Sequence, residues 1–130
     1  MASELRVTTI ANNAGTESVD TTYVINGSAK AWVNFNGTGT IAARDSLGLS
    51  SLGDDATGRY TVNLTNAMEN ADYATTTGIG QGYTQTAAGG VTDACVLGAS
   101  TVSSFKIFSV NGSTETDFER VIASSHGDLA

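Results

Sequence analysis

The sequence contains no proline, one cysteine (Cys95) and one histidine (His126). A single cysteine excludes an intramolecular disulfide, and one Cys with one His is too few for a structural zinc site. Because Cys95 lies in an apolar, strand-like segment, we expect it to be a small buried residue. His126 has no neighbouring partner beyond Asp128, and we expect no catalytic role for it.

Positive charge is also scarce. Six Lys and Arg stand against 13 Asp and Glu, which gives a net charge of −7 and a pI near 4.3. Nucleic-acid binding requires clustered cations, whereas the cations of this chain are scattered singly: Arg6, Lys30, Arg44, Arg59, Lys106 and Arg120. We therefore expect no nucleic acid and no anionic membrane as partners. An acidic surface keeps a densely displayed protein soluble.

Long apolar runs are absent as well. No stretch approaches the ~20 apolar residues that a membrane span needs, so we expect no membrane insertion. The sequence begins Met1-Ala2-Ser3-Glu4, without the cationic and apolar regions of a signal peptide. We expect synthesis in a reducing cytoplasm.

Threonine, serine and glycine dominate what is present. The chain has 19 Thr, 13 Ser and 15 Gly but only 4 Phe, 4 Tyr and 1 Trp. Threonine favours strands because its branched Cβ packs well on a pleated surface. The composition predicts a β-protein with a thin core, which gains stability by burying surface against copies of itself.

Period-two alternation recurs along the chain and predicts half-buried strands. Tyr60, Val62 and Leu64 alternate with polar residues, and Ala31, Val33 and Phe35 share one face with Trp32 on the other. Between residues 103 and 110, Phe105 and Ile107 share one face while Phe108 and Val110 share the opposite face. We expect this last strand to be covered on both sides, by a second sheet and by a neighbouring subunit, so that Phe108 and Val110 are candidates for subunit packing. Trp32, the sole tryptophan, is a candidate for core or subunit packing.

Turn residues separate these strands. Asn-Gly pairs occur at Asn26-Gly27, Asn36-Gly37 and Asn111-Gly112, and the third predicts a hairpin between strands near 102–110 and 116–124. Residues 54–58 predict a polar loop before the Tyr60 strand. Short antiparallel strands at this spacing predict an all-β fold, either a β-sandwich or a jelly roll.

Two strand-like pieces, residues 5–10 and 19–25, precede the main domain. An isolated hairpin is at best marginal in water, so these pieces must pair with the main domain or with other copies. We interpret residues 1–28 as an extended β arm for attachment or trimerisation, and residues 29–130 as the head domain. The candidate contact residues of the arm are Leu5, Val7, Ile10, Val19, Tyr23 and Ile25.

The segment Lys30-Ala31-Trp32-Val33-Asn34-Phe35-Asn36-Gly37-Thr38-Gly39-Thr40 resembles the β-rich head domain at the ends of many phage tail-fibre proteins. The resemblance resumes over residues 58–73 and is weaker at 103–107 and 125–128. The segment 3–10 is similar to those that precede such heads in fibre stalks. The resemblance implies a homotrimeric virion component without catalysis. The family often has proline where this chain has Glu69, and residues 78–101 lie outside the resemblance.

Other motifs have two interpretations each. Asp54-Asp55 is either a solvated turn or a weak calcium site, since hard cations take carboxylate oxygens. The glycines of residues 78–82 resemble a phosphate loop but no helix is expected after them, so residues 78–93 are interpreted as an exposed loop. In it, Tyr83 and Gln85 either contact a receptor or simply connect strands. Trp32, if it is not packed, could stack on a sugar.

Two functions follow. The first is a short trimeric fibre on the virion surface, whose head contacts a host-surface glycan or protein. The second is a capsid decoration (cement) protein whose arm seats trimers on the major capsid lattice, which the short arm favours. Neither requires an enzyme, a cofactor or a metal.

Overall fold

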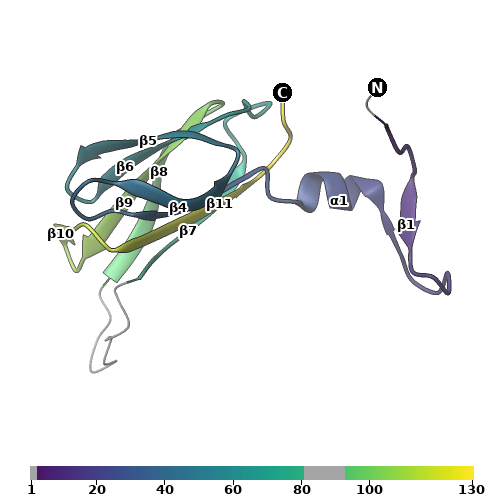
Figure 1. Cartoon of the computed structure of the whole chain (residues 1–130), viewed down its shortest axis with the longest axis horizontal. Helices are drawn as coiled ribbons and strands as arrows, with labels where there is room; N and C mark the ends of the chain where they lie inside the picture. The colour runs from purple at the N-terminus through teal and green to yellow at the C-terminus, as the bar shows by residue number, and fades with distance from the viewer. Residues whose placement is uncertain (1–2, 81–92) are drawn as a thin grey trace.

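The structure, a computed structural model, describes residues 3–80 and 93–130. Figure 1 shows a head of β-strands and an arm that projects from one end of it. The arm contains β1 (Thr9–Ala11), β2 (Ser18–Asp20) and α1 (Thr21–Gly27). The head contains β3 (Ala31–Asn36), β4 (Ala42–Leu47), β5 (Leu49–Ala56), β6 (Arg59–Leu64), β7 (Ala74–Gly80), β8 (Asp93–Thr101), β9 (Ser104–Asn111), β10 (Thr114–Glu115) and β11 (Arg120–His126).

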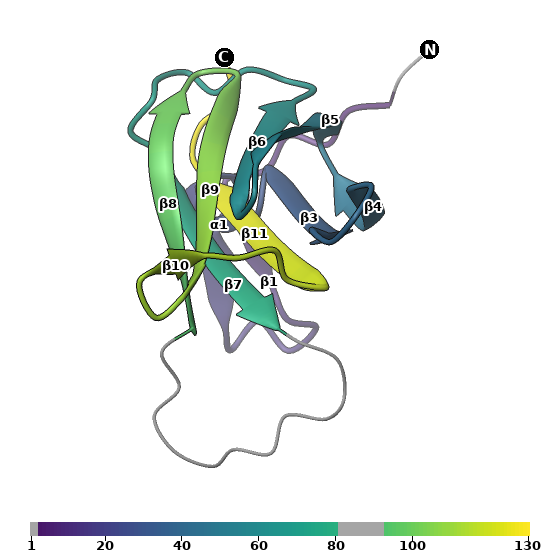
Figure 2. The same cartoon turned by 90° about the vertical axis from the view of Figure 1, so that its left-hand side faces the viewer.

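The head strands form two antiparallel sheets. The five-stranded sheet has the order β10-β9-β6-β5 with β8 also paired to β9, and the four-stranded sheet has the order β4-β3-β11-β7. The two sheets lie on opposite sides of one core (Figure 2). The prediction of an all-β protein with antiparallel strands is confirmed.

The core lies where the inward-facing residues of both sheets meet. Buried and half-buried residues alternate along the whole of β3 and along β6 from Tyr60 onward, as the sequence predicts. In β9, Phe105 and Ile107 are buried, whereas Phe108 and Val110 lie on the other face and are partly exposed. Residues from outside these strands complete the core: Met68, Tyr73, Phe118, Val121 and Ala123.

Tyr60 links the two sheets. Its side chain is fully buried, and its ring meets Phe35 of the opposite sheet edge-to-face, with 5.1 Å between centroids. Its hydroxyl lies 2.8 Å from Asp117 Oδ1 and 3.2 Å from the Gly37 carbonyl oxygen. A Cβ at Gly37 would lie 2.5 Å from this hydroxyl, so the close approach requires glycine.

The hairpin turn predicted at Asn111-Gly112 is confirmed, but the prediction that the strand near 116–124 returns beside β9 is wrong. Gly112 has a φ of 62°, as the first residue of a type II′ turn requires, and the returning strand β10 has only two residues. The next strand, β11, instead pairs with β3 and β7 in the other sheet. The chain crosses over because Asp117 accepts a hydrogen bond from the Gly58 N–H (2.6 Å) and Phe118 enters the core.

The other two Asn-Gly pairs do not form tight hairpin turns. Gly27 is the last residue of α1, and neither Gly27 nor Gly37 has a positive φ. In the β3–β4 connection the left-handed residue is Gly39, with a φ of 64°. Asn36 instead holds the loop through its side chain, which bonds to Thr38.

The predicted strands of the arm are only partly present. Pairing is limited to β1 and β2, of three residues each, and a helix replaces the predicted strand from Thr21 onward. Asp20 begins the helix because its carboxylate accepts a hydrogen bond from the Thr22 N–H at 2.7 Å, as an N-cap does. Residue 28, the predicted arm boundary, lies between α1 and β3.

We predict that Gly58→Ala lowers the free energy of unfolding by about 3–4 kcal/mol. Gly58 has a φ of 67°, and a Cβ there would lie 2.5 Å from the Ser109 carbonyl oxygen. Gly39→Ala is the matched control, because Gly39 has a similar φ with no atom within 4 Å of its Cβ position. Only backbone strain of about 1–2 kcal/mol applies there. Urea denaturation measures both; equal losses would contradict the steric argument.

Candidate interaction surfaces

The acidic pair Asp54-Asp55 lies at the end of strand β5 rather than in a loop, and only Thr57 and Gly58 form the turn. Asp55 accepts hydrogen bonds from Lys106 Nζ (2.6 Å) and Thr61 Oγ1 (2.7 Å). The Lys106 bond, followed by the Thr61 bond, lowers the pKa of the Asp55 carboxyl. Residues 3–80 and 93–130 contain no group of three or more His, Cys, Asp or Glu able to hold a metal ion.

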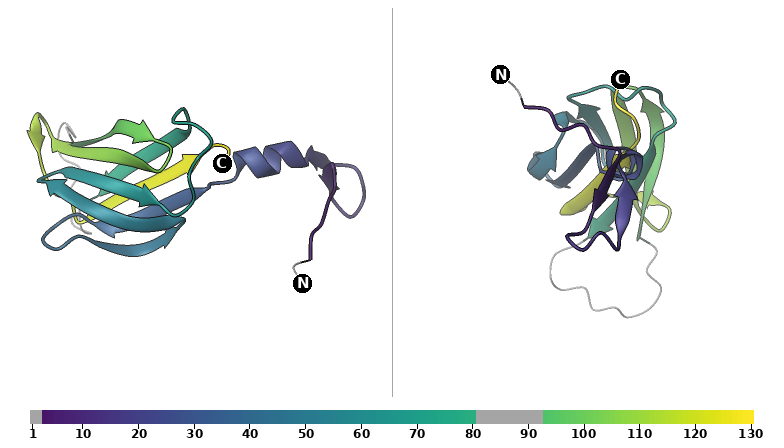
Figure 3. Two further views of the ribbon diagram at one scale, coloured as in Figure 1. Left: turned by 90° about the horizontal axis from the view of Figure 1, so that it is seen from above. Right: turned by 90° about the vertical axis from the view of Figure 1, so that its right-hand side faces the viewer.

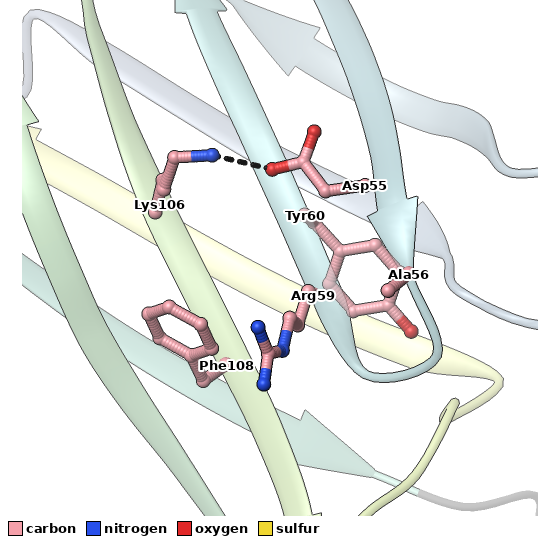
Figure 4. A pocket seen from close by; sticks show the side chains of 6 residues that line it. All are labelled: Asp55, Ala56, Arg59, Tyr60, Lys106 and Phe108. Atoms are coloured by element: carbon pink, nitrogen blue, oxygen red, sulfur yellow. Dashed lines mark hydrogen bonds and ion pairs between the residues drawn. The ribbon is translucent and has the colours of Figure 1, made fainter.

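A shallow hollow of about 280 Å³ opens beside this ion pair on the outer face of the five-stranded sheet (Figure 4). Arg59 lies 5.7 Å from the Phe108 ring centroid and pairs with Glu115 at 2.7 Å. Both cations of the hollow are thus already paired with carboxylates. Exposed pairs of this kind contribute ~0–1 kcal/mol each. The hollow suits polar surface contacts, and its side chains form no nucleophile–base pair.

Phe108 and Val110 lie on the same outer face. Phe108 pairs in register with Val96 of β8, whose side chain is 51% exposed. Gly98 makes room for the phenyl ring, because a Cβ there would lie 2.3 Å from Phe108 Cε2. The predicted face of β9 is therefore confirmed, and its role in subunit packing stays a prediction. Val96 extends the patch and was not singled out from the sequence, since its neighbours obscure the alternation.

The arm carries the most exposed apolar surface in the described chain. Its helix has no buried residue, and Leu5, Tyr23 and Ile25 are 84%, 76% and 61% exposed. Figure 3 shows the arm extending away from the head, so the head does not cover this surface. The surface folds into a groove of about 420 Å³ lined by Glu4, Leu5, Arg6, Val7, Ile10, Thr21, Val24 and Ile25.

Four of the six predicted arm residues line this groove: Leu5, Val7, Ile10 and Ile25. Val19 and Tyr23 are exposed outside it. Val24 joins the groove and was missed, because strand alternation places it opposite Ile25 whereas the helix places both at the groove. The only charged groups in the groove, Glu4 and Arg6, pair with each other at 2.9 Å.

Two side chains of the head hold the base of the arm. Lys30 Nζ donates to the Ile25 carbonyl oxygen, and His126 Nδ1 lies 3.0 Å from the Gly27 carbonyl oxygen. Both carbonyls belong to the last turn of α1, where intrahelical donors are absent. His126 is thus a structural contact at the end of β11 and contacts Ser124 through its other nitrogen. This contact is invisible in the sequence because 99 residues separate His126 from Gly27.

Trp32 lies on the outer face of the four-stranded sheet and is partly exposed. It borders a groove of about 230 Å³ that it shares with Asn34, Thr76, Ile122 and Ser124. Ile122 is 43% exposed, and Leu47, in register with Trp32, is 51% exposed. The structure thus separates Trp32 from Phe108 and Val110, which lie on the other sheet.

The remaining sequence candidates divide into three cases. Tyr83 and Gln85 lie outside the described residues. Gly78 and Gly80 belong to strand β7, so the interpretation of residues 78–80 as a loop is wrong; these glycines pair with Ile122 and Arg120. Cys95 lies in strand β8 as predicted, half-buried against the core, and this burial raises the pKa of its thiol.

Comparisons with protein-family models, with curated proteins and with solved structures found no match for this chain. In the described part of the chain, no helix has the length and apolarity needed to span a membrane. The candidate surfaces therefore rest on their own geometry.

We predict that stability declines above pH 10, in part through Tyr60. Burial, followed by the hydrogen bond with Asp117, raises the pKa of Tyr60 well above its ordinary value of 10.0. The folded state therefore retains a proton that the unfolded state loses, and the stabilisation present below pH 10 is lost as pH rises towards the folded pKa. Tyr73 and Cys95, whose pKa values burial also raises, contribute in the same direction.

Tyr60→Phe tests this assignment. At pH 7 the variant loses about 1–3 kcal/mol because Asp117 loses a buried donor, and its decline above pH 10 is shallower than that of the wild type. Tyr23→Phe, on the exposed arm, is the control and retains the wild-type profile. Urea denaturation from pH 7 to pH 11 measures both effects; an identical alkaline slope in wild type and Tyr60→Phe would contradict the assignment.

Proposed function

We propose that this chain is a non-enzymatic structural protein of a bacteriophage particle, displayed on the virion surface as a homotrimer. The observation that carries the proposal is the arm, whose apolar side chains project from the head with no cover from the rest of the described chain. The resemblance of residues 30–40 to phage fibre heads is the basis for proposing a phage particle and a trimeric state. The head is a β-sandwich that presents its surfaces at the end of the arm.

The arm supports assembly because it is too small to be stable alone. Isolated helices below ~12–15 residues are marginal in water, and α1 has seven residues. Two strands of three residues add little. Full burial of a Leu or Ile side chain contributes about 1.5–3 kcal/mol. Burial of Leu5, Val24 and Ile25 against neighbouring arms would supply the stability that the isolated arm lacks.

The charge pattern of the arm groove agrees with contacts between copies. Identical chains of net charge −7 repel each other, so their contact surface must be locally neutral. The groove meets this condition because Glu4 and Arg6 pair within the same arm. The outer patch of Phe108, Val110 and Val96 offers a second apolar contact between heads.

In the fibre form of the proposal, the head contacts a host-surface glycan or protein and the arm joins the tail. The alternative is a capsid decoration protein. In that form the trimers bind the major capsid lattice and stabilise it. Copy number separates the two: a decoration protein is among the strongest bands of purified virions on a stained gel, and a tail fibre is among the faintest. Absence from purified virions would refute both forms.

We predict that Leu5→Asn with Ile25→Asn converts the trimer to a monomer without unfolding the head. Both side chains are more than half exposed in the single chain, so their loss does not disturb the core. Val102→Asn is the matched control, because Val102 is an exposed apolar residue of the head (42%) and leaves the trimer intact. Sedimentation equilibrium reports the mass and circular dichroism the fold. A trimeric double variant would refute assembly through the arm.

A further inference from the structure

We propose that the groove across the outer face of the four-stranded sheet binds one ring of a neutral sugar. The groove runs over β3, β11 and β7, where Trp32 is in register with Ser124 and Thr76, and Asn34 with Ile122 and Gly78. A Cβ at Gly78 would lie 3.1 Å from Ile122 Cγ1, so the absence of a side chain there leaves room for Ile122 at the edge of the groove. The hollow of about 230 Å³ suits a single ring.

Asn34 is the observation that points to a ligand. Its Oδ1 is shielded from solvent and has no hydrogen-bond partner in the described chain. A buried acceptor left without a donor is costly, and native proteins seldom retain one without a reason. Asn34 lines the groove, so a rotation of its side chain towards the groove would bring Oδ1 within reach of a ligand hydroxyl, which would supply the donor.

The rest of the lining defines the ligand class. Trp32 and Ile122 provide an apolar wall, and the hydroxyls of Thr76 and Ser124 lie beside it. No charged side chain lines the groove, which disfavours phosphate, sulfate or carboxylate groups. The C–H face of a sugar ring stacks on an aromatic side chain while its hydroxyls both donate and accept. An apolar wall with a few placed polar groups is the usual form of a small-ligand site.

A second copy of the chain is the competing occupant of this face. Stable protein interfaces bury about 800 Å² on each partner across broad matched surfaces. The groove is instead a small concave site in which hydroxyl and amide groups lie beside an apolar wall, and the arm and the Phe108 patch already offer apolar surfaces for assembly. One sugar ring in so shallow a groove binds weakly. At this step the inference rests on the proposed function, because a trimer on a particle binds through several weak contacts at once and gains avidity.

Trp32 is the only tryptophan of the chain, so intrinsic tryptophan fluorescence of the full-length protein reports on this groove alone. Maltohexaose, cellohexaose and chitohexaose serve as neutral probes, and polygalacturonate as the anionic one. We expect at least one neutral probe to shift the emission saturably and to protect Trp32 from acrylamide, and polygalacturonate to have no effect. An effect of polygalacturonate alone, or no effect of any neutral probe, would overturn the proposal.

Asn34→Val separates a binding role from a structural one. The variant removes the buried acceptor and places a β-branched residue in strand β3, so we expect a higher Tm together with a loss of affinity of about tenfold or more. Asn63→Val is the matched control on the outer face of the other sheet, where Asn63 bonds to Ser51. It should leave the affinity unchanged. A lower Tm with unchanged affinity for Asn34→Val would show that Asn34 is only structural.

Acrylamide quenching before any sugar is added tests the competing occupant. If Trp32 is already shielded in the trimer and becomes accessible in the Leu5→Asn/Ile25→Asn monomer, a second copy covers the groove and the proposal is overturned. Mass measurement and virion incorporation are separate readouts. A monomer that binds a neutral probe would therefore refute the proposed assembly and leave the sugar site standing.

Discussion

The contact of Tyr60 with the opposite sheet is the interaction on which the rest of the head depends. The ring packs against Phe35, and the hydroxyl bonds with Asp117, whose carboxylate also holds the Gly58 N–H. One aromatic side chain therefore joins both sheets and fixes the turn before its own strand. In a chain with so few large aromatic residues, this concentration of contacts is what keeps a thin core closed.

A closed core of this kind leaves each sheet with a second face. Because strand side chains alternate, every residue buried on β3 or β9 has a neighbour that points outward. The outward residues differ between the sheets: β3 presents Trp32 and Asn34 beside polar groups, and β9 presents Phe108 and Val110 beside Val96. The first face has a groove in which an apolar wall of Trp32 and Ile122 lies beside hydroxyl and amide groups, and the second has an apolar patch bordered by the charged side chains of Arg59 and Lys106. The two faces therefore suit different partners.

The sequence predicts the strands that alternate strictly and fails where a distant contact decides the local structure. The faces of β3, β6 and β9 follow from period two alone. The helix α1 does not, because its Thr, Val and Ile residues favour a strand and only the Asp20 cap and the C-terminal contacts with Lys30 and His126 make a helix. Distant contacts also explain why the strand after the Asn111-Gly112 turn does not pair with β9 as the sequence predicts. Asp117 directs the chain across the core through hydrogen bonds with Tyr60 and Gly58, which are 57 and 59 positions away in the sequence. The unpaired acceptor of Asn34 and the groove around it could not be predicted from the sequence either, because they depend on the neighbours that β11 and β7 bring to β3.

The arm and the head thus stand in opposite thermodynamic situations. The head encloses a core within one chain, with Phe35, Tyr60, Phe105 and Phe118 buried in it. The arm buries nothing in its helix and is held to the head through backbone carbonyls of its last turn. In the assembly proposed above, the arm would become ordered on contact with other chains, and binding that orders a segment costs conformational entropy. The elements of the described arm are small, since α1 has seven residues and β1 and β2 have three each, and ordering them costs correspondingly little. An apolar and locally neutral arm on an acidic head with its own core is consistent with the assembly proposed above.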